Sequence, residues 1–189
     1  YFDSINQNLG FDKNFRYPSY FHVFDRFINF SNKYNFKYSI YIIGKDLENP
    51  EIKARVKDWY LMGHEIGNHT YTHPMNMGAL TKEKVRYEIL KSHEMINKSI
   101  GVEPQGFISP GWNSSQKIIE VLIEQNYLYD TSLFNSALTL PIVLKNALNH
   151  YKKPRKIFEI INRRDYFYFL NKPKSPFFVD SNYKPLERR

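Results

Sequence analysis

The alternation of strand-like and helix-like segments between residues 18 and 130 constrains the fold of this chain more than any other feature. The strand-like segments are short, β-branched or aromatic, whereas the segments between them carry apolar residues at helical spacing. The expected strands are residues 38–44, 64–68, the start of 106–112, and 127–130; the expected helices are residues 18–36, 50–62, 81–100 and one beginning at about 115. Repeated strand–helix units predict an α/β fold built on a parallel sheet or barrel.

Residues 64–74 read His-Glu-Ile-Gly-Asn-His-Thr-Tyr-Thr-His-Pro and hold three of the six histidines of the chain. The zinc-peptidase pattern H-E-x-x-H requires a continuous helix, but here the second histidine comes one residue late and Gly67 with Asn68 interrupts any helix. A strand followed by a loop that carries His69 and His73 fits better. Their spacing of four allows both imidazoles to bind one metal ion, although the spacing alone also suits solvated surface histidines.

Length and composition limit the classes of protein that the chain can belong to. Its 189 residues predict a single domain, residues 1–189, with the informative motifs within residues 1–133. No apolar run is long enough for a transmembrane segment, and the start of the chain lacks the pattern of a signal peptide. The absence of cysteine excludes disulfides and thiolate ligands; it slightly favours a cytoplasmic location without establishing one.

The charge is concentrated at one end of the chain. Residues 145–189 hold 12 basic and 4 acidic residues, which accounts for the whole net charge of +8. Such a segment suits contact with an anionic surface, such as phosphates, a membrane face or an acidic glycan, and it equally suits a solvated basic surface. No nucleic-acid recognition motif accompanies the charge, so specific nucleic-acid binding is not expected.

Four segments resemble, in the right order, the motifs of the polysaccharide deacetylases, the NodB-like carbohydrate esterases. They are Phe2-Asp3, similar to the family's T-F-D-D; residues 63–74, similar to its central metal motif; residues 107–112, similar to F-R-x-P-x-G; and residues 129–132, similar to Y-D-S-S. The resemblance implies a distorted (β/α) barrel of about seven strands, incomplete here at both ends. It also implies an active site at the carboxyl ends of the strands.

The resemblance further implies an activity and a set of site residues. The activity is metal-dependent removal of an N-acyl group, with N-acetyl the first choice, from an amino sugar in a polysaccharide, a glycolipid precursor or a lipid-linked sugar. His69 and His73 would bind a divalent ion, with zinc the first choice and cobalt or nickel as substitutes. Asp3 would be the general base or, in a shifted register, the third metal ligand. Asp130 would be a second catalytic residue. The substrate-binding residues would be Pro110, Gly111 and Trp112, with backbone N–H groups near Gly111 stabilising the oxyanion.

Three departures from the family pattern support a rival hypothesis. Ser4 stands where the family has an aspartate that serves as third metal ligand, and Ile108 replaces an arginine that orients the base. The late L-x-H motif of the general acid is represented only by a weak match ending at His150. A catalytically impaired carbohydrate-binding module on the same fold is therefore the alternative.

Overall fold

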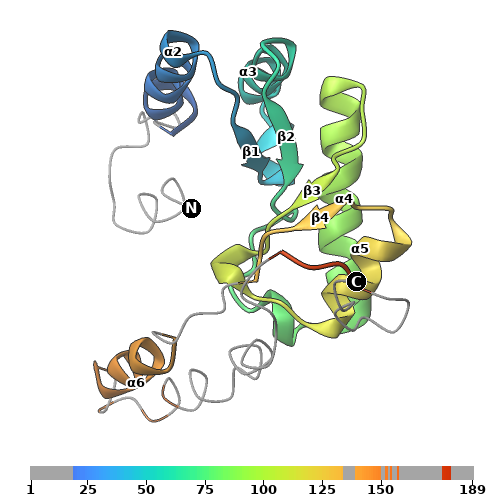
Figure 1. Ribbon diagram of the computed structural model, residues 1–189. Coiled ribbons are helices and arrows are strands. Elements are labelled where there is room, and N and C mark those ends of the chain that lie inside the picture. The colour runs from blue at the N-terminus through green and yellow to red at the C-terminus, as the bar shows by residue number, and fades with distance from the viewer. Residues whose placement is uncertain are drawn as a thin grey trace.

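The computed structural model describes residues 19–133, 139–149 and 176–179, together with positions 152, 154 and 157. Within these residues the strands form one four-stranded sheet in the order β1-β2-β3-β4, and every neighbouring pair is parallel (Figure 1). The strands are β1 (Ser39–Ile42), β2 (Glu65–Asn68), β3 (Gly106–Phe107) and β4 (Tyr129–Asp130). The predicted α/β fold with a parallel sheet is confirmed, whereas the described residues show four strands of the predicted seven and no closed barrel.

A helix follows each of the first three strands, as the sequence pattern predicts. The helices are α2 (Phe24–Tyr34), which continues from a π-helical turn η1 (Ser19–Val23), α3 (Pro50–Leu61), α4 (Lys82–Ile100), α5 (Gln116–Glu124) and α6 (Thr139–Asn149); short 3-10 turns are η2 (Gly44–Glu48), η3 (Met77–Ala79) and η4 (Pro110–Trp112). Because parallel connections are right-handed, α3, α4 and α5 lie on the same face of the sheet. Helix α6 lies apart from the sheet (Figure 1).

Local capping signals explain where these helices begin and end. The side chain of Asn49 accepts hydrogen bonds from the backbone of Glu51 and Ile52 at the start of α3, and Thr81 and Ser115 cap α4 and α5 in the same way. Each such cap typically contributes about 1 kcal/mol. Gly101 ends α4 with a φ of 83°, a conformation that glycine adopts without strain.

One face of the sheet forms the hydrophobic core with the helices. Ile40 of β1 is in register with Ile66 of β2, and both side chains pack with Trp59 of α3 and Ile96 of α4. A second cluster joins Phe107 of β3 to α4 and α5. Side chains at paired positions point to the same face of a sheet. The register therefore divides the strand residues into those that face the helices and those that face away.

The face of the sheet away from the helices carries a hydrogen-bonded polar network. The Tyr41 hydroxyl donates to that of Tyr129 at 3.2 Å, and Tyr129 donates to Glu65 at 2.5 Å. Burial raises the pKa of Tyr129, and the bond to Glu65 adds to this shift. Glycine is required beneath the two rings, because a Cβ on Gly67 would lie 2.5 Å from Tyr41 and a Cβ on Gly106 would lie 2.3 Å from Tyr129.

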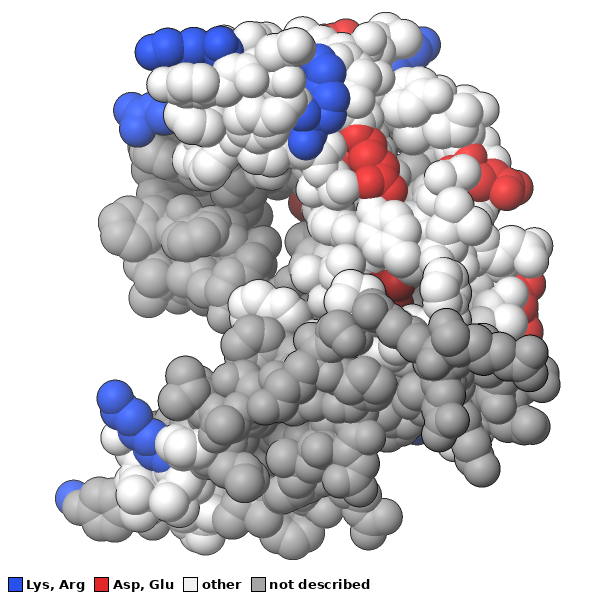
Figure 2. All heavy atoms as spheres, viewed as in Figure 1, with Lys and Arg blue, Asp and Glu red and all other residues white. Residues whose placement is uncertain are grey.

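The surface charge of the described residues is uneven. On the face shown in Figure 2, lysine and arginine side chains gather at the end formed by α2 and α3 and on α6. Most of the basic segment 145–189 lies outside the described residues. Among the helices that the structure describes, none has the length and apolar character needed to span a bilayer.

Candidate active site

The His69 side chain lies directly after β2, at the carboxyl end of the sheet. Its Nδ1 atom is 2.7 Å from the carbonyl oxygen of Ile108, which follows β3. Because a carbonyl can only accept, Nδ1 carries the proton and Nε2 keeps its lone pair. Burial lowers the pKa of His69, although the Ile108 carbonyl opposes that shift. The result is a neutral imidazole in the tautomer that can bind a metal ion through Nε2.

The His73 ring lies against that of His69. The two ring centroids are 4.8 Å apart and the ring planes are inclined by 68°. Thr70 and His73 both have positive φ, 65° and 59°, and this tight backbone brings the two rings together. Burial, followed by the neighbouring His69, lowers the pKa of His73 to about 4. The two predicted metal ligands are thus adjacent and uncharged at neutral pH.

Asn68 holds the beginning of the histidine loop. Its Oδ1 atom accepts the N–H of Thr70 at 2.8 Å, and its Nδ2 atom donates to the Ile89 carbonyl at 2.9 Å and to the Tyr127 hydroxyl at 2.6 Å. The side chain is completely buried, so these hydrogen bonds satisfy polar atoms that no water can reach. Asn68 therefore fixes the backbone of the loop, while the imidazole of His69 is oriented by the carbonyl of Ile108.

Glu88 of α4 holds the middle of the same loop, a role that the sequence did not reveal. Its carboxylate accepts the N–H groups of Tyr71 at 3.0 Å and Thr72 at 2.7 Å, and the Thr72 hydroxyl at 2.6 Å. The residue is only 7% exposed. Charge-assisted hydrogen bonds of this kind are stronger than neutral ones. The available signal was an acid placed among the apolar residues of the helix, directly before Ile89.

The turn after β3 packs against the histidine loop. Gly111 and Trp112 have φ of 61° and 50°, which turns the chain sharply within η4. The Asn113 side chain donates to the Met75 carbonyl at 3.0 Å and to the Pro110 carbonyl at 2.7 Å, joining the two loops. The Trp112 N–H donates to the Ser109 carbonyl at 3.2 Å, so this N–H, expected near the oxyanion, already has an acceptor.

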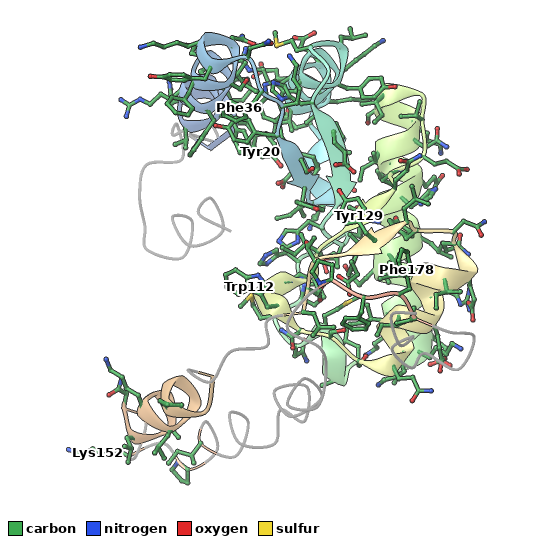
Figure 3. The ribbon with its side chains drawn as sticks, in the orientation of Figure 1. Tyr20, Phe36, Trp112, Tyr129, Lys152 and Phe178 are labelled. Atoms are coloured by element: carbon green, nitrogen blue, oxygen red, sulfur yellow. The ribbon has the colours of Figure 1, made fainter. Side chains whose placement is uncertain are left out.

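A cleft of about 660 Å³ lies beside the two histidines and the turn after β3. From the strand-end loops it is lined by His69, His73, Met75, Ile108, Ser109, Gly111 and Trp112. On the other side it is lined by Phe24 and Phe27 of α2, by Tyr38 directly before β1, and by Ser39, Ile40 and Tyr41 of β1. Trp112 is 57% exposed and projects on the side opposite α4 and α5 (Figure 3). Of the three predicted substrate-binding residues, Gly111 and Trp112 line the cleft, whereas Pro110 is buried and does not.

The structure places Asp130 differently from the two histidines. Asp130 is in register with Phe107, so its side chain is on the sheet face that packs against the helices, and it is not part of the cleft lining. Its Oδ1 atom accepts the N–H of Ser132 at 2.8 Å and the Ser132 hydroxyl, which itself accepts the Ser109 N–H at 2.7 Å. Although the residue is partly exposed, burial of the carboxyl raises the pKa of Asp130 to about 6, against both Ser132 hydrogen bonds.

The remaining predicted site residues cannot be placed. Asp3, Ser4 and His150 lie outside the described residues. Within the described ranges, no third histidine, aspartate or glutamate joins His69 and His73 in a group that could hold a metal ion.

Comparison with known proteins identifies the family. Residues 9–129, well over half of the chain, match the sequence profile of the family described as Polysaccharide deacetylase. The chain belongs to the polysaccharide deacetylase family. The profile match includes the histidine loop and the turn after β3, whereas Asp3 and Asp130 fall just outside it.

Two proteins named as deacetylases are similar in sequence to this family member. It is 30% identical over 97 residues to peptidoglycan-N-acetylglucosamine deacetylase of Bacillus cereus, covering 51% of this chain and 34% of that protein. It is 38% identical over 79 residues to peptidoglycan deacetylase of Helicobacter pylori, covering 41% of this chain and 26% of that protein. The matched segments therefore span about a third or less of these relatives.

A solved structure shows the same fold. The CE4 family pseudoenzyme from Bacillus anthracis superposes with a TM-score of 0.52 at 22% identity, covering 56% of this chain and 37% of that one. At this identity the likeness extends to the fold alone.

Proposed function

We propose that this deacetylase-family chain removes an N-acetyl group from an amino sugar of a glycan, with a divalent metal ion held at His69 and His73. The observation that carries the proposal is the pair of adjacent neutral imidazoles, with ring centroids 4.8 Å apart, in a cleft that Trp112 also lines. The names of the two similar deacetylases both support peptidoglycan as the glycan, and that of the Bacillus cereus protein supports N-acetylglucosamine as the sugar. Peptidoglycan is the polysaccharide we favour over a lipid-linked precursor.

The donor set fits a borderline metal ion such as zinc. Imidazole nitrogen suits Zn²⁺, and the hydrogen bond from His69 Nδ1 to the Ile108 carbonyl is the kind of outer contact that orients a metal-binding histidine. When bound, a divalent cation supplies Lewis-acid chemistry, polarising the amide carbonyl and lowering the pKa of water. A third protein ligand would come from outside the described residues. Ser4 stands at the family's ligand position, and Asp3 would take that role only if another residue were the base.

The reaction adds water across the amide bond. The water oxygen bonds to the acyl carbon, the C–N bond breaks, and the leaving nitrogen takes a proton, so that acetate and a free amine result. A carboxylate must accept the proton of the water, and we assign this role to Asp3 by its family resemblance. The exposed Trp112 offers a flat apolar surface on which a sugar ring can stack.

Asp130 is better suited to positioning than to proton transfer. Its carboxyl fixes Ser132, and Ser132 in turn accepts the N–H of Ser109 in the cleft wall. Its side chain lies on the helix-facing side of the sheet. We therefore propose that Asp130 supports the turn after β3 and does not contact the substrate. The continuation of the sheet into a distorted barrel of about seven strands within a single domain is part of the same proposal.

Metal content and amine release test the proposal together. Purified protein dialysed against zinc is expected to retain about one ion per chain, and His69→Ala and His73→Ala are each expected to lower that content sharply. His22→Ala is the matched control, since His22 lies exposed on η1. Release of amine from N-acetylglucosamine oligomers is expected of the zinc-loaded protein and not of the two loop variants. Unchanged metal content in the doubly substituted protein contradicts the metal assignment. Saturable oligomer binding without amine release favours the carbohydrate-binding alternative.

A further inference from the structure

Large apolar side chains are exposed inside the cleft that holds the histidine pair. Phe27, Met75 and Trp112 are 49%, 44% and 57% exposed, and all three line this cavity together with His69 and His73. Exposed apolar surface that is gathered in one cavity is typical of a site for an apolar ligand group. The histidine pair is where the amide of a substrate would lie, so an apolar ligand group next to it would belong to the same molecule.

Phe24 and Phe27 of α2 and Tyr38, directly before β1, form one side of the cleft, called here the aromatic wall. Phe27 contacts Phe24 with ring centroids 6.2 Å apart and meets Tyr38 edge to face at 6.0 Å. Phe24 in turn stacks on the buried Trp59 at 4.7 Å. Because the wall rests on the hydrophobic core, it is preformed and binding an apolar group to it costs little ordering.

The described lining of the cleft contains no lysine, arginine, aspartate or glutamate. Its polar side chains are the two histidines, two serines and the hydroxyls of Tyr38 and Tyr41. A sugar polymer presents hydroxyl groups along its length, and each one that is buried needs a hydrogen-bond partner. The aromatic wall, which has no charged side chain and few hydroxyls, is therefore suited to a hydrocarbon group next to the amide.

We propose that the aromatic wall binds the acyl chain of an N-acylated amino sugar whose acyl group is longer than acetyl. The inference rests on the proposed function, because it places the amide at His69 and His73 and directs the acyl chain toward Phe27 and Tyr38. Trp112 remains the surface for the sugar ring. The substrate class is then an amino sugar whose N-acyl group extends from acetyl, the shortest member, to a chain of medium length.

Direct binding measurements test this without turnover. Isothermal titration of the zinc-loaded protein would compare N-acetyl-, N-butanoyl- and N-octanoylglucosamine. Affinity is expected to rise by up to about fourfold for each added methylene until the wall is covered. Phe27→Ala is expected to remove most of this gain, and Phe27→Leu to remove a smaller part. Phe30→Ala is the matched control, since Phe30 lies on the same helix at 52% exposure but does not line the cleft.

Three results would overturn the inference. One is equal affinity for the three sugars, and another is an equal chain-length gain in the Phe27 and Phe30 variants. The third is octyl glucoside binding as tightly as N-octanoylglucosamine, because the chain would then bind from either end of the sugar. Failure of amine release alongside chain-length-dependent binding would instead count against the hydrolytic function, so the two failures are distinguishable.

Discussion

Replacing Glu88 by alanine is expected to destabilise the histidine loop and, with it, the whole protein. The carboxylate accepts three hydrogen bonds from Tyr71 and Thr72 while it is 7% exposed itself. A hydrogen bond to a charged group contributes about 1.5–3 kcal/mol, but Thr72 is exposed and water can replace part of the loss. The net cost of Glu88→Ala is therefore about 2–4 kcal/mol. For a chain of this size that corresponds to a fall of about 4–16 °C in Tm.

The measurement is thermal and urea unfolding, together with zinc affinity. Glu88→Gln keeps one acceptor oxygen but turns an NH₂ group toward the loop donors, so about half of the loss is expected. Glu94→Ala is the control on the same helix, because Glu94 forms surface ion pairs with Lys91 and Lys98. Zinc affinity is expected to fall in the Glu88 variants, since the loop must then be ordered by the metal ion. A Glu88→Ala protein as stable as Glu94→Ala would refute the reasoning.

Two further predictions concern Asp130 and Asn68. Burial raises the pKa of folded Asp130 to about 6, above the value of about 3.9 in an unfolded chain. Its contribution to stability is therefore present below pH 4 and lost as the pH rises to 6, by at most about 3 kcal/mol. Asp130→Asn should flatten that part of a urea-unfolding pH series, and an unchanged slope would contradict the assignment. Asn68→Asp should lower the free energy of unfolding by about 2–4 kcal/mol, because an oxygen replaces the donor to the Ile89 carbonyl and the Tyr127 hydroxyl; a loss under about 1 kcal/mol by thermal unfolding would contradict it.

Much of the fold follows from signals that are local in the sequence. Helices α3, α4 and α5 each begin directly after a residue whose side chain caps the helix, and α4 ends at Gly101. The alternation of strands and helices predicts the parallel sheet. A crossover helix returns the chain to the end of the sheet where the previous strand began, so the next strand runs in the same direction. The four-residue spacing of His69 and His73 similarly predicts that the two side chains lie close together. Because Gly67 interrupts any helix, they are predicted to lie on a loop.

Only the tertiary structure decided how the site works. The carbonyl that selects the His69 tautomer belongs to Ile108, 39 residues away, and a backbone carbonyl has no sequence signature. The register of β3 and β4 turned Asp130 toward the helices, because a shift of one residue would exchange the faces of the sheet. The packing of α2 beside β1 brought Phe27 into the cleft and left Phe30 outside it. These outcomes depend on distances between segments, whereas the sequence alone determined the segments themselves.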